Sequence, residues 1–158
     1  MLYLKSLFFT IIAPGSLTLL IPFFILRSRA NLFPAVWNGF NYVGILIMVT
    51  GITIYFWCVG EFISSGKGTP APYDPPKYLV AQGLYQYSRN PMYVGVSSII
   101  LGEAVFFKSV WMIMYILVVL LAFHLRIIYY EEPTLKKLFG ASFDEYCRRV
   151  PRWIGLTK

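Results

Sequence analysis

Four long apolar segments constrain this chain more than any other feature. They cover residues 7–26, 42–63, 92–107 and 110–128, and all but the third approach the roughly 20 residues that a helix needs to cross a bilayer. Hydrophobic residues make up 58% of the 158 positions and charged residues only 13%, which is more apolar surface than a soluble domain of this size buries. The sequence therefore predicts an all-α integral membrane protein with about four transmembrane helices.

Short connections and prolines shape these segments. Only Lys108-Ser109 separates the third segment from the fourth, which predicts a tight C-terminal helical hairpin. Pro14 and Pro22 lie inside the first segment and predict kinks in it. We expect the first segment to be retained, because Arg27-Ser28-Arg29 follows it, whereas a signal-peptide cleavage site consists of small residues.

Lysines and arginines are distributed unevenly. With four spans, the N-terminus, the loop 64–90 and the C-terminal tail share one side, and eleven of the 14 basic residues fall there. The positive-inside rule predicts that this side is cytoplasmic. The net charge of +7 is explained by this bias and by attraction to anionic lipid, so no nucleic-acid partner is expected. Two distant cysteines and a single histidine predict neither a disulfide framework nor a metal site.

The chain is expected to form a single membrane domain, 1–158. Residues 1–63 hold the first two helices, 64–91 form a proline-rich cytoplasmic loop, and 92–158 hold the hairpin and the tail. Pro70–Pro76 cannot continue a helix; a stiff connector and a loop that closes over a ligand are both open interpretations. Ser142 and Glu145 form a capping-box pattern, which predicts an amphipathic helix that starts there and lies on the membrane surface.

Polar groups gather at the mouths of two of these apolar segments. Ser88-Arg89-Asn90-Pro91-Met92-Tyr93-Val94-Gly95 precedes and enters the third segment, and Tyr130-Glu131-Glu132 follows the fourth. Ionisable groups in such places usually serve a ligand. Pro91 suits the first turn of a helix, whose free amides attract anions. The alternative for the two glutamates is a solvated pair before Pro133.

These residues, with Gly83-Leu84-Tyr85 and the terminal stretch from Leu138-Phe139-Gly140 to Arg149-Val150-Pro151-Arg152, resemble the isoprenylcysteine carboxyl methyltransferases and their phospholipid methyltransferase relatives. The resemblance implies an integral membrane enzyme that binds S-adenosylmethionine at the cytoplasmic ends of its last two helices. Such families commonly carry Arg-His-Pro-x-Tyr, whereas this chain has Asn90 at the histidine position. Asparagine hydrogen-bonds but takes up no proton at neutral pH, which favours a binding role there.

The resemblance, taken with the helix mouths, yields a set of candidate site residues. Arg126 and Glu132 are the candidate catalytic residues. The candidate cofactor-binding residues are Gln82, Gly83, Leu84, Tyr85, Arg89, Asn90, Pro91, Tyr93, Glu131 and Glu132.

Each of these candidates has a structural alternative. Arg89 and Arg126 could instead be anchors that snorkel to headgroups. His124 is interpreted first as a structural histidine. Glu103, inside a span, is expected to hydrogen-bond to a neighbouring helix.

Methyl transfer from an activated donor mainly requires alignment and exclusion of water, which suits so sparse a site. The function favoured is S-adenosylmethionine-dependent methylation of a lipophilic acceptor that enters from the bilayer, most like isoprenylcysteine carboxyl methylation. The alternatives are phospholipid amine N-methylation, methylation of a lipophilic thiol or acid, a sterol-reductase-like NADPH enzyme and a non-catalytic scaffold. The chain lacks a strand followed by Gly-x-Gly-x-x-Gly, which excludes a soluble dinucleotide-binding fold.

Overall fold

The computed structural model describes residues 2–28, 37–67 and 76–155, and within these ranges it is helical without strands. Seven α-helices, two π-helical turns and one 3-10 turn follow in the order α1 (Leu2–Gly15), η1 (Ser16–Leu20, π), α2 (Ile21–Arg27), α3 (Gly39–Ser64), η2 (Gly83–Gln86, 3-10), α4 (Pro91–Phe107), α5 (Val110–Arg126), η3 (Ile127–Glu131, π), α6 (Glu132–Phe139) and α7 (Ala141–Arg149). The π turns join helices without a break, so α1–η1–α2 and α5–η3–α6 are each one long helix.

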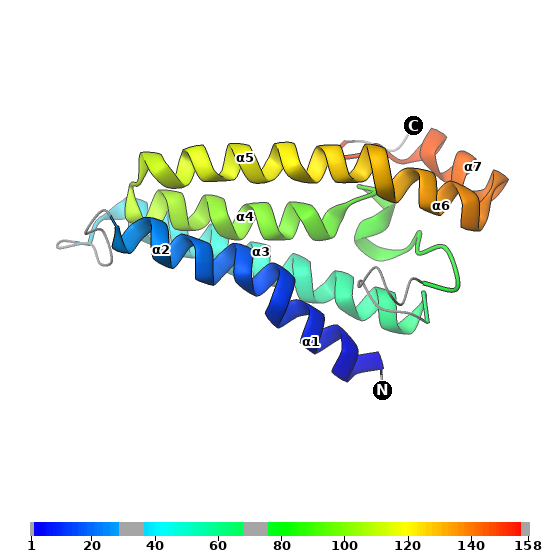
Figure 1. Ribbon diagram of the computed structural model, residues 1–158, viewed down its shortest axis with the longest axis horizontal. Coiled ribbons are helices and arrows are strands. Elements are labelled where there is room, and N and C mark those ends of the chain that lie inside the picture. Colours follow the sequence, from blue (N-terminus) through cyan, green and yellow to red (C-terminus); the bar gives the residue numbers. More distant parts are fainter. Residues whose placement is uncertain (1, 29–36, 68–75, 156–158) are drawn as a thin grey trace.

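Helices α2, α3, α4 and α5 lie side by side in a bundle (Figure 1). Among the described residues, three helices are long and apolar enough to cross a membrane, namely Leu7–Arg27, Gly39–Ser64 and Val110–Phe139, and Pro91–Phe107 is shorter but also apolar. The end of α3, the start of α4 and helices α6 and α7 lie toward the right-hand end in Figure 1, and the start of α1 points toward the same end but away from the bundle. The predicted all-α membrane architecture is confirmed.

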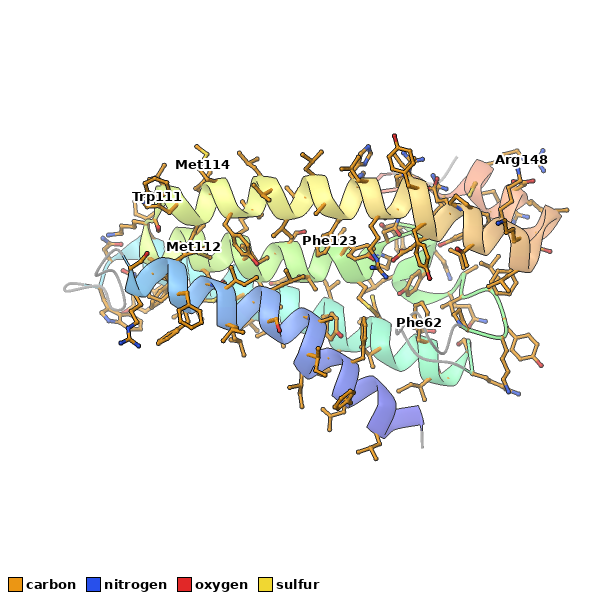
Figure 2. All side chains as sticks on the ribbon, viewed as in Figure 1. Phe62, Trp111, Met112, Met114, Phe123 and Arg148 are labelled. Carbon is orange, nitrogen blue, oxygen red and sulfur yellow. The ribbon has the colours of Figure 1, made fainter. Side chains whose placement is uncertain are left out.

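Apolar side chains cover both the inside and the outside of the bundle. Ile100, Met112 and Ile127 are fully buried and belong to α4, α5 and η3. Met114 points away from the bundle, whereas Met112 and Phe123 of the same helix point toward its neighbours (Figure 2). Val118 is 64% exposed, and such exposed apolar side chains are what a lipid-facing surface requires.

The tightest contact in the bundle is the antiparallel pair α3–α4. Gly44 meets Gly102 and Gly51 meets Gly95, so that a Cβ atom built on Gly51 would lie 2.6 Å from the carbonyl oxygen of Gly95. Small residues allow helix backbones in membranes to approach closely. Asn41, fully buried, adds a hydrogen bond of 2.8 Å from its Nδ2 to the carbonyl oxygen of Phe106. We call this contact the glycine seam; the sequence analysis does not single out its glycines.

Both π turns stand in the same relation to a proline. In η1 the Ile21 N–H bonds to the Ser16 carbonyl, and in η3 the Glu132 N–H bonds to the Ile127 carbonyl, five residues back in each case. The residue that follows each donor is proline, Pro22 or Pro133. A proline inside a helix lacks the donor and clashes with the preceding turn, and a π turn is one way for the helix to continue through it.

The consequences differ between the two long helices. The kink predicted for the first segment is confirmed: α1 leans away from the bundle while α2 lies along it (Figure 1). The helix that contains the fourth apolar segment continues beyond residue 128, because η3 carries it past Pro133 to Phe139. The tight hairpin between α4 and α5 is confirmed, with Lys108 in the left-handed conformation at φ 50°.

The C-terminal helix begins earlier than its capping-box pattern predicts. Helix α7 starts at Ala141 after Gly140, whose φ is +53°, and no side chain caps it, so Ser142 lies within the first turn. Gly140 both ends α6 and begins α7, because glycine readily adopts this backbone. The apolar face of α7 packs on α6 and on the loop beside residue 79. In the proline-rich loop, residues 68–75 lie outside the described part of the chain.

Candidate functional site

A cavity of about 280 Å³ opens at the end of the bundle where α4 begins and α6 and α7 lie. Most of its lining is apolar and comes from α1, α3, α4, α5, α6, α7 and the loop that precedes α4. Its charged and polar lining, apart from four tyrosines, consists of Arg89, Asn90, Arg126, Glu131 and Glu132. The two helix mouths singled out by sequence therefore meet in one cavity.

Glu132, the first residue of α6, joins two arginines from different parts of the chain. Its Oε1 lies 3.0 Å from Nη1 of Arg89. Arg152 approaches the same carboxylate from the C-terminal segment, with Nε 2.8 Å from Oε1 and Nη2 2.9 Å from Oε2. This fork-like geometry is the strong form of an ion pair, and hydrogen bonding to Glu132 raises the pKa of Arg152 above its usual value. Glu132 thus ties α4, α6 and the C-terminal segment together.

Glu131 forms a second set of charged contacts. Nε of Arg126 donates to Oε1 of Glu131 at 2.9 Å and to the Tyr93 hydroxyl at 3.1 Å, and that hydroxyl donates to Glu131. Residues five apart point about 140° away from each other in an α-helix, but they share a face in a π turn. The π turn η3 therefore brings Arg126 and Glu131 together. We call Arg89, Arg126, Glu131, Glu132 and Arg152 the arginine–glutamate cluster.

Asn90 holds the C-terminal segment against the start of α4. Its Nδ2 donates to the carbonyl oxygen of Arg152 at 3.0 Å, and the Arg89 N–H donates to the carbonyl oxygen of Pro151 at 2.9 Å. Pro91 occupies the first helical position of α4, as predicted. Asn90 thus positions Arg152, the residue that pairs with Glu132.

The η2 turn contributes Tyr85 but not its neighbours. Tyr85 is buried and lines the cavity, and its carbonyl oxygen accepts a hydrogen bond of 2.7 Å from the Tyr146 hydroxyl. Burial raises the pKa of both phenols, so they remain neutral donors. Gln82, Gly83 and Leu84 do not line the cavity.

Gly83 instead turns the chain at φ +55°, where a Cβ would meet the Glu61 carboxylate at 2.8 Å. Leu84 packs on a separate small core around Cys58 and Val80. Pro91 begins α4 but likewise does not line the cavity.

The remaining ionisable residues lie outside the cavity lining. His124 accepts a hydrogen bond of 3.4 Å from the Trp153 indole N–H and stacks on that ring, which agrees with a structural histidine. Glu103 is buried, and its Oε2 has no partner among the described residues. Cys147 Sγ lies 2.7 Å from Nη1 of Arg89, and burial raises the pKa of this thiol. In the described ranges no group of His, Cys, Asp or Glu could hold a metal ion.

Two contributions to the site are missing from the sequence analysis. Arg152 is quoted there only as part of a motif, because nothing in a linear pattern shows that the tail returns to Glu132. The first helix lines the cavity with Phe9, Ala13, Pro14 and Leu17, although its sequence reads only as a membrane span. The spacing of three of these residues, four apart each time, is the signal that one face of that helix is special.

Three curated proteins show which chains this one is similar to. It is 29% identical over 111 residues to the protein-S-isoprenylcysteine O-methyltransferase of Schizosaccharomyces pombe, covering 64% of this chain and 47% of that protein. It is 37% identical over 73 residues to protein-S-isoprenylcysteine O-methyltransferase B of Arabidopsis thaliana, an alignment that covers 46% of this chain and 37% of that protein. It is 26% identical over 129 residues to the probable protein-S-isoprenylcysteine O-methyltransferase of Oryza sativa subsp. indica, an alignment that covers 78% of this chain and 66% of that protein.

The aligned part of this chain thus spans less than half the length of the first two relatives. No solved structure matches it. The sequence model of the family described as phospholipid methyltransferase matches residues 40–142, from the start of α3 into α7, and so contains both helix mouths that meet in the cavity. This all-helical membrane protein therefore belongs to the phospholipid methyltransferase family, a family of enzymes that transfer methyl groups.

Proposed function

We propose that this protein is an S-adenosylmethionine-dependent methyltransferase that acts on a lipophilic acceptor, most like the methylation of an isoprenylcysteine carboxylate. One observation carries the proposal. A single cavity is lined by Arg89, Arg126, Glu131 and Glu132 of the arginine–glutamate cluster and also by apolar side chains of the first helix, Phe9, Ala13 and Leu17. A polar cofactor and an apolar acceptor chain can therefore meet in the same enclosed space, which is the arrangement that ligand sites of this kind require.

The cluster fits the amino-acid end of S-adenosylmethionine. Nε of Arg89 is buried and has no hydrogen-bond partner among the described residues, and buried donors are normally satisfied. A ligand carboxylate would supply the missing acceptor, and Glu132 beside it would pair with a ligand amino group. Asn90 and Tyr85 would complete this side. When bound, S-adenosylmethionine supplies a methyl group already activated by its sulfonium centre.

The charge of the cluster favours an anionic acceptor. Three guanidinium groups face two carboxylates, which leaves one positive charge in excess. A carboxylate or thiolate reduces that excess, whereas an ammonium group increases it, and the interaction is strong where water is scarce. Arg126 lines the cavity and is 43% exposed at its side chain. We assign to it the orientation of the acceptor anion, and to Glu132 the placement of the donor.

The chain's own residues would do little beyond binding and alignment. The apolar lining excludes water from the reacting groups, and Tyr93, held by Arg126 and Glu131, fixes the position of the two side chains. No proton transfer is required when the acceptor is already a carboxylate. An amine acceptor would have to lose a proton first, and Glu131 is occupied by Arg126 at 2.9 Å.

Calorimetry and methyl transfer test the proposal together. The detergent-purified protein should bind S-adenosylhomocysteine and not NADPH, and it should transfer labelled methyl groups to prenylcysteines in preference to aminophospholipids. If the protein prefers aminophospholipids or a lipophilic thiol, that class of compound is the acceptor in place of the isoprenylcysteine carboxylate. Binding of NADPH alone would support a reductase, and binding of neither ligand would support a scaffold.

The orientation in the membrane is part of the proposal. We propose that both termini, the proline-rich loop and the cluster face the cytoplasm, because the end of the bundle that carries the cluster also holds most of the basic residues. Cysteines introduced at Lys67 and Lys158 should be protected from an impermeant reagent in intact cells, and one introduced at Lys108 should be labelled. The opposite pattern would invert the orientation.

A further inference from the structure

One face of the first helix contributes three apolar side chains to the cavity. Phe9, Ala13 and Leu17 all line the cavity, and their spacing of four residues places them along one face of α1 and its π turn. We call these three residues the α1 face. Ala13 stands at its centre and carries the smallest side chain of the three.

The opposite side of the same helix faces outward. Ile11 is 64% exposed and Ile12 is 52% exposed, and both are apolar, as expected for side chains in lipid. Helix α1 therefore has one face toward the cavity and another toward the outside of the bundle. Substitutions on its two faces therefore test the cavity and the lipid contact independently.

Helix α1 is positioned against the bundle by polar contacts on either side of Ala13. The hydroxyl groups of Thr10 and Tyr55 lie 2.9 Å apart, and the Tyr115 hydroxyl donates to the carbonyl oxygen of Leu17 at 2.9 Å. In the π pattern of η1 this carbonyl faces Pro22, which has no N–H to offer, so Tyr115 supplies a donor that the helix lacks. The α1 face is thus held in place although the helix leans away from the bundle (Figure 1).

We infer that the α1 face, with Ala13 at its centre, determines the length and bulk of the apolar chain that the acceptor can carry. This inference rests on the proposed function and concerns the apolar chain of the acceptor, which the charged cluster does not recognise. The occupant is the acceptor's own hydrocarbon chain, because the α1 face and the arginine–glutamate cluster line one continuous cavity. A larger side chain at position 13 shortens the space available to that chain, and a smaller one at position 17 extends it.

The test compares acceptors that share a cysteine carboxylate and differ in chain, namely geranyl-, farnesyl- and geranylgeranylcysteine. Ala13→Phe should lower the ratio of kcat/KM for geranylgeranyl- over geranylcysteine by about tenfold, a discrimination that apolar pockets achieve. Ile12→Phe, next to it on the outward face, should leave the ratio unchanged. Leu17→Ala should raise it, which keeps the inference testable if Ala13→Phe does not fold.

Two further measurements separate this inference from the proposed function. S-adenosylhomocysteine affinity, measured by calorimetry, should be equal in the wild type and all three variants. A farnesyl chain bearing a diazirine should label residues 9–17 on irradiation, whether or not methyl transfer occurs. An unchanged kcat/KM ratio in both Ala13→Phe and Leu17→Ala, or labelling confined to other helices, would overturn the inference. If the wild-type protein transfers no methyl group but residues 9–17 are labelled, only the proposed function is overturned.

Discussion

The contact between α3 and α4 differs from the contact between the first helix and the rest of the bundle: the first is closely packed, and the second borders a cavity. The glycine seam brings backbone against backbone, and a Cβ on Gly102 would lie 2.7 Å from the Gly44 carbonyl oxygen. Around Ala13, by contrast, α1 borders a cavity of about 280 Å³ and is held on either side of it by hydroxyl groups. The glycine seam is closely packed, whereas the contact around Ala13 borders free volume.

This difference separates two tasks. The start of α4 carries Arg89 and Asn90, and close-packed backbones fix its position because interiors of this kind transmit strain and do not yield. The proposed acceptor needs room for an apolar chain, and α1 leaves that room beside Ala13. Arg89 and Asn90 of the charged half thus adjoin the rigid pair, whereas the apolar half includes the loosely held helix.

The largest effect is expected from filling the glycine seam. Gly51→Leu places a side chain where even a Cβ would lie 2.6 Å from the Gly95 carbonyl oxygen. We expect a loss of about 3 kcal/mol or more in the free energy of unfolding, since overpacking a tight contact forces backbones apart. Thermal unfolding in detergent measures it. Gly60→Leu is the matched control in the same helix, because nothing lies within 4 Å of a Cβ there; equal losses in both variants would refute the seam.

The next effect concerns the charged half. Glu132→Gln removes the carboxylate that Arg89 and Arg152 share, and S-adenosylhomocysteine affinity should fall by about 1.5–3 kcal/mol, the range for charge-assisted hydrogen bonds. Glu145→Gln changes an exposed pair with Arg149 and should leave the affinity unchanged. If the two variants bind equally well in calorimetry, the cluster does not hold the cofactor.

A smaller effect is expected on the loosely held side. Tyr115→Phe leaves the Leu17 carbonyl without the donor it now has at 2.9 Å, which should destabilise the fold by roughly 1 kcal/mol or less. Cofactor affinity should stay the same, because Tyr115 does not line the cavity. Unfolding measurements and calorimetry on the same preparation distinguish the two quantities. A fall in cofactor affinity would show that α1 and the charged half are not separate.

The smallest effect is expected at Asn90, for which the sequence resemblance implies a histidine. Its Nδ2 donates to the Arg152 carbonyl at 3.0 Å, and a neutral histidine can also donate from one ring nitrogen. Asn90→His should therefore change S-adenosylhomocysteine affinity by less than about 1 kcal/mol, whereas Asn90→Leu should weaken it more. Equal losses in the two variants would argue against this hydrogen bond.

The sequence predicts much of the fold because lipid leaves few choices. Apolar runs of spanning length must be helices, and three of the four predicted segments end within a few residues of the observed helices. The fourth differs at Pro133, since a proline usually ends a helix and only the three-dimensional context shows that η3 accommodates it. The glycine seam escaped notice because glycines seven residues apart in two separate helices acquire meaning only when the helices pair.

The candidate site is predictable in part for the same reason. The motif around Arg89 precedes the third apolar segment and the glutamate pair follows the fourth, so their meeting follows from the hairpin between α4 and α5. Arg152 and the α1 face come from distant parts of the chain, and no pattern in the sequence predicts that both lie near the site. Gln82, Gly83 and Leu84 belong to the motif but form a turn without lining the cavity. The sequence alone does not show whether a motif residue contacts the cavity or only shapes the turn.

The π turn η3 (Ile127–Glu131) holds one residue more than a turn of α-helix would. Residues five apart share a face in a π turn, and residues four apart share a face in an α-helix. Deleting one residue between Ile127 and Glu131 would therefore let the helix close into regular α geometry with Arg126 and Glu131 still on one face, and α6 would keep its orientation. Deleting one residue of α5 outside the π turn would instead turn α6 by about 100°, because each residue of an α-helix adds about that rotation, and Glu132 would move away from Arg89. The π turn is thus the part of this long helix in which relatives of this chain could lose one residue and keep the charged site.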